Sequence, residues 1–121
     1  MNYDIYLGPN GAYVGCKIMK PVPRELVREL TLELRNFGFE HKLTRFLLDA
    51  RTVRNTESRP ENYLSVRKDL SEFEPNPGNR VAVLITPGDR THDLMHNALR
   101  GAGINLLPFE DEAEAVAWLT S

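Results

Sequence analysis

An unbroken apolar run marks the centre of the chain. Residues 81–85 (VAVLI) are consecutive aliphatic or β-branched residues, a pattern typical of a strand that is buried on both faces of a sheet. Residues 86–89 (TPGD) should end this strand, because proline cannot donate to the ladder and Gly-Asp favours a turn. Apolar residues at helical spacing follow, at Leu94, Met95, Ala98 and Leu99. This strand, loop and helix form the repeating unit of an α/β sheet.

Four other segments have strand patterns. Residues 2–7 alternate between Tyr3, Ile5 and Leu7 on one side and polar or aromatic residues on the other, which predicts a half-buried edge strand. The Gly-Pro-Asn-Gly turn at 8–11 joins it to a strand at 12–19, so the two should form a hairpin. Further strands are predicted at 43–50 and 104–109.

Helical periodicity appears at four places. One helix ends at Gly101, and the others are predicted at 23–37, 59–73 and 110–120. Gly38 suits the left-handed residue that follows a helix end. Ser58 and Glu61 match a capping box at the start of the helix at 59–73.

The predicted order is therefore ββαβαβαβα. This order predicts one α/β domain over residues 1–121, with a sheet of about five strands and four helices. The second to fifth strands should be parallel with right-handed crossovers, and the first should be antiparallel.

Composition narrows the class of protein. The net charge is −2 with a pI near 5.9, which gives no electrostatic reason to expect nucleic-acid binding. No apolar run approaches the roughly 18 residues needed to cross a membrane. No signal peptide is recognisable, and the one cysteine, Cys16, has no partner for an internal disulfide. We expect a soluble cytoplasmic protein.

Three local pieces and the element order point to a known family. They are Phe46-Leu47-Leu48-Asp49, then Arg80-Val81-Ala82-Val83 with its turn and helix, and the tail at 109–119 (FEDEAEAVAWL). The element order resembles the STAS domain, the SpoIIAA-like fold of bacterial anti-sigma factor antagonists. The tail looks like the F-x-D-x-x-E-A-x-x-W-L ending of small bacterial STAS-like proteins, many of which have no assigned function.

The resemblance implies a regulatory site at the start of the second helix. In anti-sigma factor antagonists a serine there, in an Asp-Ser-Ser-Gly context, is phosphorylated by a partner kinase. Ser58 occupies that place, but Glu57 replaces the aspartate and Arg59-Pro60 replaces the Ser-Gly. The interpretation of Ser58 as a helix cap is favoured over that of a phosphoacceptor, and the two roles do not exclude each other.

A second candidate site lies where the parallel strands should end. Open α/β sheets bind ligands at the carboxyl ends of their strands. That edge should collect Asp49, Arg51, Arg54, Ser58, Thr86, Gly88, Asp89, Arg90 and His92. Arg51, Arg54 and Arg90 could hold an anion there. The favoured alternative is that these are solvated loop charges, with Asp89 or Thr91 capping a helix.

Catalytic and metal motifs are weak. His92 and His96 are four residues apart, but the sequence lacks HEXXH, so two exposed histidines are favoured over a metal site. Cys16 is interpreted as a buried structural thiol, and Trp118 as part of the core. No nucleophile–base pair, P-loop or GxGxxG is present.

We therefore expect a non-enzymatic, cytoplasmic protein-interaction or regulatory module with an unidentified protein partner and without cofactor or metal. The alternative is a small-molecule or anion-binding domain at the strand ends. Homodimerisation is compatible with an exposed edge strand at 2–7, because such edges must be protected.

Overall fold

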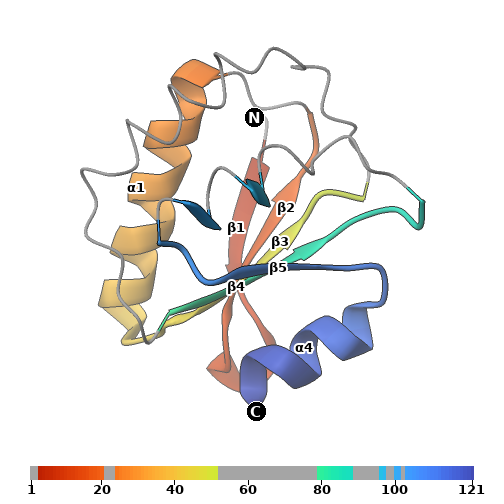
Figure 1. Ribbon diagram of the computed structural model, residues 1–121. Helices are drawn as coiled ribbons and strands as arrows, with labels where there is room; N and C mark the ends of the chain where they lie inside the picture. The colour runs from red at the N-terminus through yellow and green to blue at the C-terminus, as the bar shows by residue number, and fades with distance from the viewer. Residues whose placement is uncertain (1–2, 21–23, 52–78, 89–95, 98–99, 102) are drawn as a thin grey trace.

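A five-stranded mixed sheet forms the frame of the molecule (Figure 1). The computed structural model describes residues 3–20, 24–51, 79–88, 96–97, 100–101 and 103–121. The elements are β1 (Tyr3–Leu7), the 3-10 turn η1 (Pro9–Gly11), β2 (Val14–Ile18), α1 (Arg24–His41), β3 (Arg45–Asp49), β4 (Arg80–Leu84), β5 (Leu106–Phe109) and α4 (Glu112–Thr120).

The strands lie in sequence order across the sheet, β1-β2-β3-β4-β5. β1 is antiparallel to β2, and the other neighbours are parallel. These directions confirm those predicted from the sequence. β1 and β5 are the two edges of the sheet.

Two complete helices, α1 and α4, are described, whereas the sequence predicted four. The predicted helix at 59–73 lies outside the described residues. Of the helix predicted to end near Gly101, four residues are described and all are helical: His96, Asn97, Arg100 and Gly101.

α1 and α4 lie on opposite faces of the sheet (Figure 1). α1 is the crossover between the parallel strands β2 and β3, and it lies on one face of the sheet. α4 follows the last strand and returns to the other face, where it packs mainly on β3, β4 and β5.

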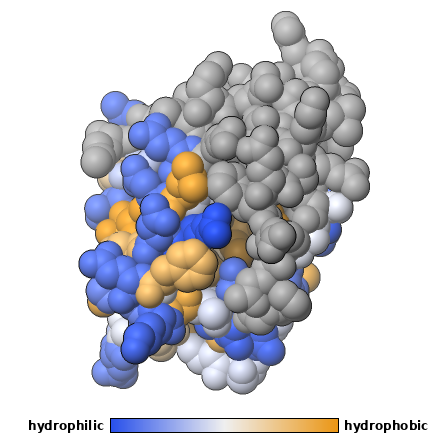
Figure 2. Space-filling view, turned by 90° about the vertical axis from the view of Figure 1, so that its left-hand side faces the viewer, coloured by the Kyte–Doolittle hydropathy of each residue, from blue (hydrophilic) through white to orange (hydrophobic). Residues whose placement is uncertain are grey.

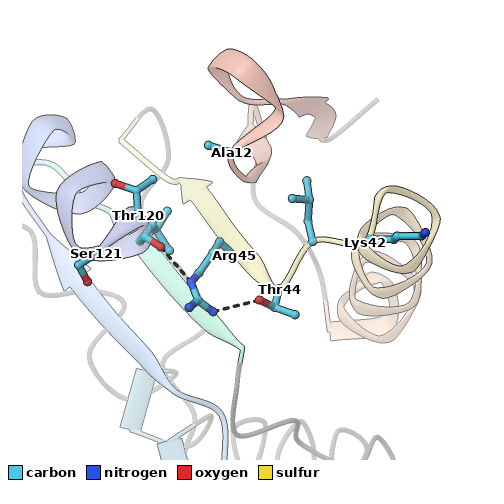
Figure 3. A pocket seen from close by; sticks show the side chains of 8 residues that line it. Ala12, Lys42, Thr44, Arg45, Thr120 and Ser121 are labelled. Atoms are coloured by element: carbon cyan, nitrogen blue, oxygen red, sulfur yellow. Dashed lines mark hydrogen bonds between the residues drawn. The ribbon is translucent and has the colours of Figure 1, made fainter.

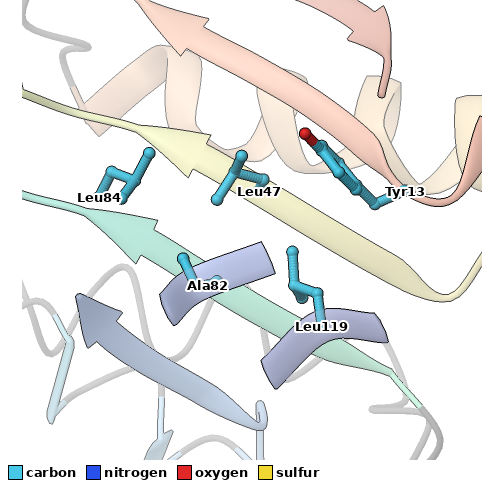
Figure 4. Packing of buried hydrophobic residues seen from close by; sticks show 6 residues of the cluster. Tyr13, Leu47, Ala82, Leu84 and Leu119 are labelled. Carbon is cyan, nitrogen blue, oxygen red and sulfur yellow. The ribbon is translucent and has the colours of Figure 1, made fainter. Parts of the chain in front are cut away.

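The core under α4 is one apolar cluster (Figure 4). Leu47 of β3 and Ala82 of β4 are register partners, and both are buried against the helix. Ala115 and Leu119 of α4 have no exposed surface. Trp118 packs against this cluster, with its ring 5.7 Å from that of Phe109, which confirms its predicted place in the core.

The end of α1 differs from the prediction. The helix continues through Gly38 to His41, and the left-handed residue is Lys42, with φ 57°. The Leu43 N–H donates to the Gly38 carbonyl at 2.8 Å and the Lys42 N–H to the Phe39 carbonyl at 3.2 Å, which is a Schellman ending.

Gly38 has a packing role instead. A Cβ at this position would lie 2.9 Å from the Phe46 ring and 3.0 Å from the Leu43 carbonyl oxygen. The missing side chain therefore lets α1 approach the start of β3 closely.

Two arginines at the amino ends of β3 and β4 hold the last turn of α4. Arg45 Nε donates to the Leu119 carbonyl at 2.9 Å, and Arg80 Nη1 donates to the Trp118 carbonyl at 2.7 Å. The Arg80 guanidinium also lies 5.5 Å from the centre of the Trp118 ring. These cations satisfy carbonyls at the helix end that carries the negative pole of the dipole.

Cys16 is fully buried in β2. Burial raises the pKa of its thiol to about 12, and the nearby carboxylates of Asp4 and Glu33 add to the shift. A thiol with this pKa is unreactive at neutral pH, which agrees with the predicted structural role.

Candidate functional site

Polar side chains meet at the edge of the sheet formed by the carboxyl ends of the parallel strands. They come from the ends of two strands and from the start of α4. Asp49 is the last residue of β3, and Arg51 follows two residues later. Thr86 comes two residues after β4, and Glu112 is the first residue of α4. Parallel strands end at the same edge, which is why residues so far apart in sequence meet here.

Arg51 is the centre of this network. Its Nε donates to Asp49 Oδ1 at 3.0 Å and its Nη2 to Asp49 Oδ2 at 2.8 Å, a bidentate pair. The Arg51 backbone N–H donates to the same Oδ1 at 3.1 Å. Nη2 also contacts Glu112 Oε1 at 3.2 Å, and the Thr86 hydroxyl donates to the Arg51 carbonyl at 2.7 Å. The side chain and the backbone of Arg51 are therefore both fixed.

Burial and charge make Asp49 and Arg51 a coupled pair. Asp49 is buried, whereas the Arg51 side chain is 42% exposed. The hydrogen bonds from Arg51 lower the pKa of Asp49, against the opposing effect of burial, and they raise the pKa of Arg51. Both groups are therefore ionised at neutral pH. With Glu112 the cluster has two negative charges and one positive charge, a net charge of −1.

The sequence predicted part of this arrangement. Asp49, Arg51 and Thr86 meet at one edge as expected. Arg54, Ser58, Asp89 and Arg90 lie outside the described residues, so their predicted roles stay predictions. Glu112 was missed, because residues 110–120 were predicted only as a helix and none of them was considered for the site. The signal was its position directly after a parallel strand, at the same edge.

The acidic residues before α4 also have a local role. Asp111 is the N-cap residue, and its Oδ1 accepts a hydrogen bond from the Ala113 N–H at 2.8 Å. This cap fixes where the helix begins, and it thereby places Glu112 beside Arg51.

The interpretation of two exposed histidines was wrong for His96, which is 5% exposed. Residue spacing fixes which residues share a helix face, but it does not fix how far that face turns toward the interior. His92 lies outside the described residues. Within the described ranges, no group of three or more His, Cys, Asp or Glu side chains could hold a metal ion.

A shallow pocket of about 360 Å³ lies at the opposite end of the parallel strands, where β3 begins (Figure 3). It is lined by Ala12, Lys42, Leu43, Thr44, Arg45, Leu119, Thr120 and Ser121. Arg45, the cation at its centre, donates to the Leu119 carbonyl and, at 3.0 Å, to the Thr44 hydroxyl. The pocket therefore lies between β3 and the end of α4, and Arg45 already holds that helix end in place.

A solved structure resembles the chain over nearly its whole length. It is an uncharacterized protein of the DUF3478 family with a SpoIIAA-like fold, from Shewanella loihica PV-4. The identity is 18%, the match covers 98% of this chain and 94% of the other, and the TM-score is 0.59. The chain has a SpoIIAA-like fold.

The SpoIIAA-like fold confirms the resemblance that the element order and the tail indicated. At this identity the likeness shows the fold alone. No family model matches the sequence, and no curated protein matches it. Among the described residues, the SpoIIAA-like chain has no helix that is long and apolar enough to cross a membrane.

Proposed function

We propose that this SpoIIAA-like chain is a non-enzymatic interaction module of the STAS type, which regulates a protein partner in the cytoplasm. The observation that carries the proposal is the Arg51 guanidinium, held at the surface by Asp49 and Glu112. A half-exposed arginine whose position is fixed loses little side-chain entropy on binding, and arginine is enriched among residues that dominate protein interfaces.

The charge balance at this edge favours a protein partner over a free anion. An anion site needs cations that are available to the ligand, whereas the Arg51 guanidinium is already paired with two carboxylates, Asp49 and Glu112. The shallow pocket lies at the other end of the parallel strands, so it does not enclose these groups. A partner that pairs with both signs of charge fits this surface better than a phosphate or a small carboxylate.

Affinity capture from the cells that naturally make the protein tests the proposal. Tagged wild type and Arg51→Gln would be compared, with Arg35→Gln on α1 as the control that removes the same charge elsewhere. We expect a stoichiometric partner that Arg51→Gln loses and Arg35→Gln keeps, while circular dichroism shows that both variants are folded. Ser58→Ala and Arg54→Ala extend the test to the sites predicted from the sequence.

The intact mass of the captured protein tests the regulatory part. A gain of one phosphate that Ser58→Ala abolishes would support phosphorylation at that residue. An unmodified protein with no partner would contradict the proposal. A broad thermal-shift screen with phosphorylated and carboxylated metabolites would then test the anion-binding alternative.

A further inference from the structure

α4 covers only part of its face of the sheet. It packs mainly on β3, β4 and β5, so the same face of the β1–β2 hairpin lies beside the helix rather than beneath it. We define the hairpin face as the four residues of β1 and β2 that lie on the α4 side of the sheet: Asp4, Tyr6, Gly15 and Lys17. Register places them on that side, because Gly15 and Lys17 pair with Leu47 and Asp49.

The hairpin face combines one aromatic ring with two opposite charges. Tyr6 is 38% exposed, and its ring lies over Gly15, where a Cβ would approach it to 2.3 Å. Asp4 and Lys17 are exposed and directly opposite each other in the β1–β2 register. Neither forms a salt bridge with another residue in the described part of the chain.

This arrangement is complementary to itself. Consider a two-fold axis that runs parallel to the strands, midway between β1 and β2, in a plane above the hairpin face. Rotation about this axis places β1 of one copy over β2 of the other, at the same level along the strands. Asp4 of each copy then faces Lys17 of the other, because the two residues share one level in the register. The two Tyr6 rings meet beside the axis, where they can stack.

We propose that the hairpin face is a homodimer interface, through which two copies of this chain associate by stacking their β1–β2 hairpins. A two-fold interface requires one patch that complements itself, and the Asp4–Lys17 register supplies this. Gly15 contributes by its missing side chain, which keeps the Tyr6 ring close to its own sheet and leaves the face flat. Sheets stack at about 10 Å, a separation that two rings lying on their sheets can fill.

The interface is small and charged, and its strength should reflect that. Two short strands bury less than the roughly 1,200 Å² typical of stable complexes, so we expect a reversible dimer whose population rises with protein concentration. Its charge pairs lie at the rim of the two hairpins, so association should weaken as salt is raised.

Complementary charge reversal tests the proposal between molecules. Asp4→Lys places lysines opposite each other across the axis, and Lys17→Asp places carboxylates opposite each other. We expect each variant alone to self-associate roughly tenfold more weakly than wild type in sedimentation velocity. An equimolar mixture of the two variants should recover the wild-type dimer, because every facing pair then has opposite signs.

The mixture separates intermolecular pairing from effects on the fold. Each variant keeps two like charges opposite each other within its own hairpin, so recovery on mixing cannot come from repair inside one chain. Glu40→Lys, a reversal at an exposed residue of α1 on the other side of the sheet, should leave association unchanged.

Three results would overturn the proposal. They are a wild type that stays monomeric up to several hundred µM, single variants that associate as wild type does, and a folded mixture that fails to recover. The last result would indicate pairing along the outer edge of β1, which does not bring Asp4 to Lys17 of the partner. Because the capture experiment follows Arg51, the outcome here does not depend on the proposed function.

Discussion

Asp49 and Arg51 show how a single pair can tie a strand end to a loop. The carboxylate is buried and accepts three hydrogen bonds from one residue, two from its guanidinium and one from its backbone N–H. A buried charge is tolerated only when it is paired and hydrogen-bonded, so the two residues act as one unit.

This pairing predicts a pH-dependent stability. Arg51→Gln should lower the free energy of unfolding by about 1–2 kcal/mol at pH 7, the range for a charge-assisted hydrogen bond discounted for the exposure of Arg51. The pKa of Asp49 is lowered in the folded state, so the pair stabilises the fold at pH values above the pKa of the unfolded chain, about 4. This stabilisation is lost as the pH falls through the lower pKa of the folded state. Urea denaturation of wild type and variant at pH 7, 5 and 3 measures the difference.

Asp49→Asn, alone and combined with Arg51→Gln, provides the control. Asp49→Asn alone should lower the free energy of unfolding at pH 7 by a similar amount. The double variant should lose little more, because both changes remove the same interaction. A difference between wild type and Arg51→Gln that is as large at pH 3 as at pH 7 would show that packing of the arginine stem causes it.

At the scale of elements, the contact between α1 and β3 depends on one missing side chain. Gly38 lies within the last turns of α1, where helix propensity alone would favour almost any other residue. The Phe46 ring and the Leu43 carbonyl occupy the space that a Cβ needs. The packing requirement therefore outweighs the local preference of the chain.

Gly38→Ala should accordingly destabilise the protein. Overpacking typically costs about 1–3 kcal/mol, which exceeds the gain of roughly 1 kcal/mol from replacing glycine in a helix. Asn36→Ala, at an exposed position of the same helix, should instead stabilise by roughly 0.5 kcal/mol. Thermal unfolding of both variants measures the contrast, and a Gly38→Ala protein more stable than wild type would refute the packing argument.

At the scale of the whole molecule, one short helix covers β3, β4 and β5 on one face of the sheet. Leu119 has no exposed surface and belongs to the cluster that joins β3, β4 and α4. Leu119→Ala should reduce the free energy of unfolding by about 2–5 kcal/mol, since a buried leucine leaves a cavity when truncated. Thr120→Ala, next to it but exposed, should change stability by less than about 0.5 kcal/mol in the same urea titration. Equal losses in the two variants would mean that helix formation, and not the burial of Leu119, determines how much α4 stabilises the protein.

The fold could be predicted from the sequence because its signals are local. The apolar run at 81–85 and the Gly-Pro-Asn-Gly turn located β4 and the hairpin to within a residue or two, and chain order then fixed the strand directions.

The candidate site was predictable only in part, because its remaining contacts are long-range. The pairing of Arg51 with Glu112 and the clamp of Arg80 on Trp118 join residues 61 and 38 positions apart. Nothing in periodicity or spacing encodes such partners. The same holds for Gly38, whose role depends on where the Phe46 ring lies.

The fully buried thiol of β2 also provides a native probe of local opening. Cys16 is the one cysteine in the sequence, and its strand lies between two hydrogen-bonded neighbours, β1 and β3. Its side chain points to the α1 side of the sheet, because its neighbours Gly15 and Lys17 point to the α4 side. A thiol reagent can reach it only when the packing of β2 on that side opens. The labelling rate of the unaltered protein, counted by mass as one adduct per molecule, therefore reports how often this part of the structure opens. Any binding event that stabilises the packing around β2 should slow that rate.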